Sequence, residues 1–217
     1  MALGGRCDIE HALGAGTRIV DLGGQAAIPG IVDSHCHPDS YAIRLTKWRD
    51  LGPAVATSRE ALLGAVRGDV GKLQPGQWFV GYRFNEHRSG GYPTLVELDA
   101  AGAGHPVFIL RTDAHIGLAN SAAMAACGIG PATADPPFGR FDRLPGSGAL
   151  TGLARETAAH VFLSRIHETD TEEEIAAGLE QVFAEAFSYG ITTLYNSLTP
   201  ARAIRAYQQM KRTGRLT

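Results

Sequence analysis

The chain has few cysteines, few aromatic residues and no long apolar segment. Among its 217 residues are three cysteines, Cys7, Cys36 and Cys127, and 7% of the residues are aromatic. An odd, sparse cysteine count argues against a disulfide framework and predicts a reducing compartment, so we expect a cytoplasmic protein. No apolar run approaches the ~18–20 residues of a membrane-spanning helix. Residues 1–10 also lack the basic and apolar regions typical of a signal peptide.

The chain also lacks an excess of either charge. Its 20 Lys and Arg face 22 Asp and Glu, which gives a formal net charge of −2. This balance argues against a nucleic-acid-binding surface and against attraction to an anionic membrane. With 44% hydrophobic and 19% charged residues, the composition is ordinary for a globular domain. We therefore expect a small-molecule substrate, no nucleic-acid or membrane partner, and leave homo-oligomerisation open.

The most informative segment that is present is IVDSHCH at residues 31–37, entered through Pro29-Gly30. It predicts a short strand in which His35 and His37 point to the same side, because side chains alternate along extended backbone. Two imidazole nitrogens can then converge on one metal ion such as zinc. Cys36 points to the opposite face, where packing is expected. The alternative is a pair of surface histidines in a loop.

The remainder alternates predicted strands and helices, which is typical of a parallel α/β architecture. Residues 138–152 carry turn residues between short β-like stretches and predict a hairpin insertion. Short strands are also expected at residues 17–22 and 25–28. Further strands are predicted at residues 78–82, 106–111 and 191–195, and helices after capping motifs at residues 57–60, 94–97 and 170–173.

Several segments together resemble a known family. They are DLGG at 21–24, AIPGIVDSHCH at 27–37, LDAA at 98–101 with HPV at 105–107, RTDAH at 111–115, NSAA at 120–123, TGLARETA at 151–158 and GITT at 190–193. In this order they resemble the amidohydrolase superfamily, and more narrowly its YtcJ-like branch, which includes N-substituted formamide deformylases. The resemblance runs from about Thr17 to the end of the chain.

The resemblance implies an α/β fold that is a partial TIM (β/α)8 barrel of the metal-dependent hydrolase type. Residues 1–29 are then the remnant of a small β-sandwich domain, and residues 30–217 the N-terminal portion of the barrel. A TIM barrel typically takes about 250 residues, and here the first strand begins only at Ile31. We therefore expect a fragment, truncated at its C-terminal end and also at its N-terminal end.

The same resemblance implies one or two divalent ions at the barrel mouth, with zinc the favoured metal, and assigns His35 and His37 to the first ion. A bridging carboxylate in the family often comes from a Lys carbamate or a Glu. Here Arg155 stands where relatives often carry Lys, and arginine cannot form a carbamate. Glu156 is then a candidate direct ligand. The alternative is a carboxylate in a first helical turn that favours the helix dipole.

His115 follows the predicted strand that ends at Arg111, a position at the mouth from which it could polarise or orient a substrate carbonyl. The alternative is a loop histidine hydrogen-bonded to backbone. The only later histidines, His160 and His167, lie in or after a predicted helix and are not assigned as ligands.

The sequence therefore predicts a metal-dependent hydrolase that opens C–N bonds of non-peptide or cyclic amides with a metal-activated water, incomplete in this chain. The alternative is a non-catalytic, truncated α/β module that acts in binding or assembly. A serine hydrolase is not favoured, because the sequence contains no G-x-S-x-G elbow.

Overall fold

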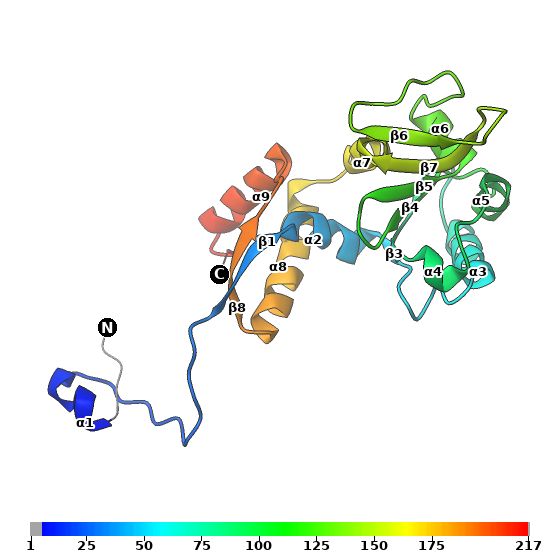
Figure 1. The fold of residues 1–217 in the computed structure, drawn as a ribbon. Helices are drawn as coiled ribbons and strands as arrows, with labels where there is room; N and C mark the ends of the chain where they lie inside the picture. Colours follow the sequence, from blue (N-terminus) through cyan, green and yellow to red (C-terminus); the bar gives the residue numbers. More distant parts are fainter. Residues whose placement is uncertain (1–5, 217) are drawn as a thin grey trace.

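The computed structural model describes residues 6–216, and its strands form two separate sheets (Figure 1). The smaller sheet contains β1 (Ile31–Cys36) and β8 (Ile191–Asn196), which pair in parallel. The larger sheet has six strands in the order β2-β3-β4-β5-β7-β6. The chain thus leaves the small sheet after β1, builds the six-stranded sheet, and returns to pair β8 with β1.

The six-stranded sheet is parallel on one side and antiparallel on the other. Its strands β2, β3 and β4 run parallel, whereas β5, β7 and β6 are joined by antiparallel pairings. The strands are β2 (Arg49–Asp50), β3 (Phe79–Phe84), β4 (Val107–Arg111), β5 (Ile116–Ala119), β6 (Gly139–Arg143) and β7 (Leu150–Glu156).

The continuous apolar run in β4 is buried on both faces. Val107 and Ile109 join one core cluster, which includes residues of the helices α3 and α5. Phe108 and Leu110 join the other, in which the ring of Phe108 stacks on Phe162 of α7 at 5.3 Å. A strand covered on both faces needs apolar residues at every position, which is why the pattern in β4 does not alternate.

Helices connect the strands, and several begin at side-chain caps. The Thr94 and Glu97 capping box is present as expected, and Asn120 caps the helix that follows it. The helices are α1 (Arg6–Ile9), α2 (Pro38–Lys47), α3 (Arg59–Val70), α4 (Glu86–Ser89), α5 (Leu95–Gly102), α6 (Ser121–Ala126), α7 (Thr157–His167), α8 (Glu172–Ser188) and α9 (Ala201–Arg212), with a 3-10 turn, η1, at Glu10–Ala12.

Two predicted helix starts lie one residue too early. Helix α3 is capped by Ser58, and α8 begins with a capping box between Thr171 and Glu174. Asp170 cannot serve as the cap of α8 because its carboxylate accepts hydrogen bonds from Lys47 and His167. The neighbouring Thr171 hydroxyl caps the helix instead.

The two connections between the sheets lie side by side. The outgoing chain passes through Lys47 and Trp48, and the returning chain through His167 and Asp170. Lys47 Nζ lies 2.8 Å from Asp170 Oδ1. The rings of Trp48 and His167 stack with their centroids 5.5 Å apart. The segment from Trp48 to His167 therefore begins and ends at the same place in the fold. This arrangement is typical of an inserted structural unit.

Close packing of α2 on α8 holds the small sheet together. A Cβ atom added at Gly178 would lie 2.7 Å from the carbonyl oxygen of Ala42 and 2.8 Å from its Cβ. Because α2 follows β1 and α8 precedes β8, this contact fixes the distance between the two helices that flank the strand pair. Only glycine fits at that point of the α8 surface.

The structure differs from the sequence expectations in two respects. Residues 13–30 form turns but no strand, and Ile19, Val20 and Ile28 are exposed, because no partner strand lies beside them. The strands predicted at residues 78–82 and 106–111 are present but pair in the six-stranded sheet, not beside β1. No closed barrel is present among residues 6–216.

The hairpin predicted over residues 138–152 is present as the antiparallel pair β6 and β7, with Arg143 opposite Leu150. Within the described part of the chain, no helix combines the length and the apolar character needed to cross a bilayer. The division at residue 29 into a β-domain remnant and a barrel portion stays a prediction.

The contact between α2 and α8 predicts opposite effects for two glycine substitutions. Gly178→Ala should destabilise the protein by about 1–3 kcal/mol, because the new methyl group overlaps Ala42 and forces the helices apart. Gly68→Ala in α3, where nothing lies within 4 Å, should stabilise by about 0.8–1 kcal/mol through helix propensity alone. Urea unfolding of both variants measures the difference. Equal effects of the two substitutions would contradict the close packing.

Asp170 should make the stability of the junction dependent on acid pH. Burial raises the pKa of this carboxyl, but hydrogen bonds from His167 and Lys47 outweigh burial and hold the pKa below its ordinary value of 3.8. A depressed pKa in the folded state means that the stabilisation is complete above the unfolded value and is lost as pH falls below it. At neutral pH, Asp170→Asn should cost about 1–3 kcal/mol.

Urea unfolding of wild type and Asp170→Asn at pH 7, 5 and 3 measures this dependence. The gap in unfolding free energy should persist to about pH 5 and shrink toward pH 3, as the wild-type carboxyl takes up its proton. A gap of constant size from pH 7 to pH 3 would show that Asp170 contributes through its shape and not through its charge.

Candidate functional site

The predicted site residues lie in two places. His35 and His37 lie at the carboxyl end of β1 in the small sheet. His115 and Glu156 lie in the six-stranded sheet, His115 just before β5 and Glu156 at the end of β7. Each pair is in contact. His115 and Glu156 line one hollow of the molecule, and His37 lines a different one.

The two histidines of β1 lie against each other with their ring centroids 5.3 Å apart and their planes nearly perpendicular. The Nδ1 atom of His37 lies 2.7 Å from the carbonyl oxygen of Ser197, so the ring donates from Nδ1. The backbone N–H of Ser197 in turn donates to the carbonyl of Cys36 at 3.0 Å. This pairing with the segment after β8 leaves Nε2 of His37 as the unprotonated nitrogen.

Cys36, between the two histidines, contacts the neighbouring strand β8. Its thiol donates to the carbonyl of Tyr195 in β8 at 3.3 Å. Burial raises the pKa of the thiol, and the nearby carboxylates of Asp33 and Asp39 raise it further. A thiol with a raised pKa is a poor metal ligand at neutral pH, since the thiolate is the form that binds metal.

The donor chemistry at β1 fits a divalent metal, but the number of donors is low. Two imidazoles, one with its Nδ1–H fixed by a backbone carbonyl, match the usual surroundings of metal-bound histidine. A catalytic zinc takes three protein ligands. Residues 6–216 contain no group of three or more His, Cys, Asp or Glu side chains arranged to hold a metal.

Glu156 binds His115 rather than the histidines of β1. Its Oε2 lies 2.8 Å from Nδ1 of His115. The antiparallel register of β5 and β7 sets Ile116 opposite Arg155, so the residue before β5 adjoins the residue after Arg155. The backbone N–H of Glu156 also donates to the carbonyl of His115 at 2.8 Å. The hydrogen bond with the Glu156 carboxylate raises the pKa of the His115 imidazole.

The backbone around this pair is strained. Glu156 has φ 52° and ψ −123°, a conformation that suits glycine far better than a residue with a Cβ. Ala114 and Phe138 also have positive φ, at 63° and 61°. Strain of this kind costs on the order of 1–3 kcal/mol per residue and is common at functional sites. The outliers therefore mark this region as a candidate site on grounds independent of the sequence motifs.

A hollow of about 600 Å³ lies beside the pair. Arg155 binds Asp142 of the neighbouring strand, with Nη2 2.7 Å from Oδ2. Arg140 binds the same carboxylate, with Nε 2.9 Å from Oδ1. The hollow is lined by Asp113, His115, Ile116, Phe138, Gly139, Arg140, Arg155 and Glu156.

Sequence reasoning missed Arg140, Asp142 and Phe138 as neighbours of His115 and Glu156. Arg140 and Asp142 belong to β6, and Phe138 directly precedes that strand. Phe138 and Arg140 line the hollow, whereas Asp142 pairs with Arg140 and with Arg155 across the hairpin. The turn residues between the strands indicated the hairpin but not which side chains face the turn before β5.

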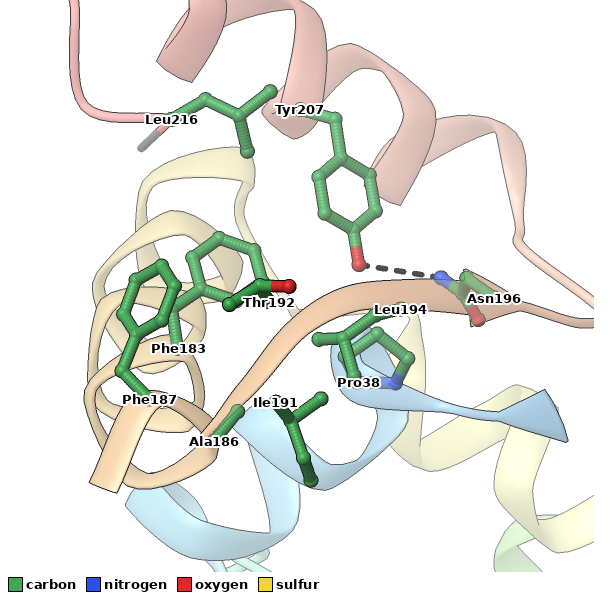
Figure 2. Close-up of a pocket in the computed structure, with 10 residues that line it drawn as sticks. All are labelled: Pro38, Phe183, Ala186, Phe187, Ile191, Thr192, Leu194, Asn196, Tyr207 and Leu216. Atoms are coloured by element: carbon green, nitrogen blue, oxygen red, sulfur yellow. Dashed lines mark hydrogen bonds between the residues drawn. The ribbon is translucent and has the colours of Figure 1, made fainter. Parts of the chain in front are cut away.

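A second hollow, of about 210 Å³, lies between α8, β8 and α9 and is mostly apolar (Figure 2). Phe183 and Phe187 of α8 line one side, and Tyr207 of α9 reaches across to Asn196, whose Nδ2 donates to its hydroxyl at 3.2 Å. Burial raises the pKa of Tyr207. Apart from Tyr207, Asn196 and Thr192 its lining is apolar, and it contains no histidine, cysteine or carboxylate.

Comparison with known proteins shows the family of the chain. A model of the amidohydrolase family matches residues 18–217. The chain is 27% identical to N-substituted formamide deformylase of Arthrobacter pascens over 219 residues, which cover 99% of this chain and 40% of that protein. It is 29% identical to Protein LONG AFTER FAR-RED 3 of Arabidopsis thaliana over 195 residues, or 89% of this chain and 33% of that protein.

A crystal structure of an uncharacterized metal-dependent hydrolase from Pyrococcus horikoshii shares the fold, with a TM-score of 0.62 and 24% identity over 97% of this chain and 38% of that one. The chain thus spans about 40% or less of the length of these relatives. From the family match over residues 18–217, we conclude that this chain belongs to the amidohydrolase family of hydrolases.

Proposed function

We propose that the protein is a metal-dependent hydrolase of C–N bonds and that His35 and His37 hold its first metal ion. The observation that carries the proposal is the hydrogen bond from Nδ1 of His37 to the carbonyl of Ser197, 2.7 Å long. Metal-bound histidines almost always donate their other ring N–H to such a group, which fixes the tautomer and the direction of the ring.

Contacts within the small sheet orient the ring of His37. Ser197 directly follows β8, so the parallel pairing of β1 with β8 brings its carbonyl to His37. Within β1, the side chain of Asp33 accepts the backbone N–H of His35 at 3.1 Å. A divalent ion held here supplies an activated water for hydrolysis. Zinc is the metal we propose, because it favours imidazole nitrogen.

The C–N bond is proposed from the likeness to a protein named N-substituted formamide deformylase. The substrate is then a small, non-peptide amide. The activity belongs to a protein in which further donors complete the metal site, since the described residues offer two imidazoles and no third ligand beside them. We also propose a cytoplasmic location, and homo-oligomerisation stays open.

A second candidate function is a non-catalytic α/β module that acts in binding or assembly. The low donor count at β1 favours it, because two histidines alone fall short of a catalytic zinc site. The two functions differ in one property that can be measured directly, namely specific binding of metal by His35 and His37.

Zinc binding therefore tests the proposed function. Equilibrium dialysis of the tag-free protein against Zn²⁺ should show binding that His35→Ala and His37→Ala each weaken by about tenfold or more, because each removes a nitrogen ligand. His105→Ala is the matched control. Nδ1 of His105 also lies within hydrogen-bond distance of a backbone carbonyl, that of Gln77 at 3.1 Å, but His105 has no neighbouring histidine. The control should bind Zn²⁺ like the wild type.

Hydrolysis of an N-substituted formamide, followed by formate release, tests the C–N specificity of the zinc-loaded protein. Activity that a chelator abolishes and Zn²⁺ restores supports the proposal. Chelator-insensitive hydrolysis contradicts it. Zinc binding that is unchanged in both histidine variants contradicts it as well and favours the non-catalytic module.

A further inference from the structure

We propose that Glu156 is a positioning residue for His115, and that the pair presents Nε2 of His115 to a polar, uncharged group of a bound ligand, such as an amide. The site is the hollow of the six-stranded sheet, beside the β6–β7 hairpin. This inference rests on the proposed function for the chemistry of the ligand, an amide, although His115 and Glu156 line a different hollow from His37. It also gives Glu156 a role different from the metal ligand that its sequence position suggested.

The geometry of the pair determines which nitrogen of His115 carries the proton. The carboxylate of Glu156 lies 2.8 Å from Nδ1 of His115, so a neutral ring carries its proton on Nδ1. Nε2, on the other side of the ring, then has a lone pair, and within residues 6–216 it has no hydrogen-bond partner. His115 lines the hollow and its side chain is 63% exposed, so a ligand can reach it.

The backbone holds His115 in place on both sides. Its N–H donates to Oδ1 of Asp113 at 3.1 Å, and its carbonyl accepts the N–H of Glu156 at 2.8 Å. Glu156 itself is held at φ 52° and ψ −123°, where a glycine would be unstrained. A carboxylate maintained in such a conformation, with its oxygen directed at an imidazole, is the arrangement expected of a residue that orients another.

The surroundings argue against a metal at this place. The nearest other carboxylate, Asp113, is 2.8 Å from the guanidinium of Arg111. The described residues therefore supply one imidazole and one carboxylate already bound to each other, which is not a metal-binding group of three.

The charges around the hollow indicate the class of ligand. At a pH above the raised pKa of His115, where its ring is neutral, the groups that line the hollow or pair with its lining residues include three cations and three anions. They are Arg111, Arg140 and Arg155 against Asp113, Asp142 and Glu156. A balanced set of this kind attracts neither an anion nor a cation, so it favours an uncharged ligand.

An apolar rim completes the site. Phe138 is 92% exposed and lines the hollow together with Ile116. The ligand class is therefore an amide that carries an apolar substituent: the amide N–H donates to Nε2 of His115, and the substituent packs on the Phe138 ring.

The test compares Glu156→Ala and Glu156→Gln with wild type by ¹⁵N NMR of the histidine rings, with the His115 signals assigned from their loss in His115→Asn. Wild type should show His115 with its proton on Nδ1. Glu156→Ala should shift the proton to Nε2, and Glu156→Gln, which keeps an acceptor oxygen, should restore the wild-type tautomer. Glu156→Gly removes the strained Cβ and gives the same readout if the alanine variant is unstable.

N-butylformamide serves as the probe for ligand binding. Its dissociation constant, measured from the His115 signals and from the backbone amides around the hollow, should rise about tenfold in Glu156→Ala and recover in Glu156→Gln. Glu168→Ala is the matched control, because Glu168 is an equally exposed carboxylate that pairs with Arg165 on α7. This control should leave both the tautomer and the binding unchanged.

Zinc binding separates this inference from the proposed function. If Glu156→Ala lowers the number of Zn²⁺ ions bound, Glu156 is a metal ligand and the inference is wrong. A proton on Nε2 in the wild type, or formamide binding unchanged in Glu156→Ala, overturns it too. If wild type binds no Zn²⁺ but the tautomer and formamide binding respond as expected, the proposed function fails while the role of Glu156 is supported.

Discussion

The parallel pairing of β1 with β8 is the constraint on which the rest of the structure depends. It joins segments that lie about 160 residues apart, as the contact of His37 with Ser197 shows. Closing so long a loop costs entropy, although the cost grows only slowly with length. The close contact of Gly178 with Ala42 offsets part of it by packing α8 on α2. The junction at Lys47 and Asp170 offsets a further part, because it brings the two ends of the intervening segment together.

In both sheets, strand pairing places an acceptor oxygen against Nδ1 of a histidine. In the small sheet, pairing places a carbonyl against His37 and so selects its tautomer. In the larger sheet, the antiparallel register of β5 and β7 places the Glu156 carboxylate against Nδ1 of His115 and leaves Nε2 without a partner among the described residues. In both cases the pairing of the strands determines which ring nitrogen is hydrogen-bonded within the protein and which is left for a ligand.

Local chemistry could be predicted from the sequence wherever neighbouring residues decide it. The apolar run of β4, the capping box at Thr94 and the β6–β7 hairpin are of this kind. The pairing of β1 with β8, and the separation of β3 and β4 into another sheet, depend on contacts between remote segments, which periodicity does not encode. The contact of Glu156 with His115 could not be predicted from the sequence either, because it follows from the register of β5 on β7.

Arg155 shows how the structure changes the meaning of a departure from the family pattern. The family resemblance places it where relatives often carry the lysine of a bridging carbamate, which arginine cannot form. In the structure its guanidinium binds Asp142 across the hairpin, and burial of Asp142 is outweighed by its two arginines, which lower its pKa. Its side chain is therefore committed to joining β7 to β6. An arginine serves there better than a lysine because its planar fork binds the carboxylate through two nitrogens.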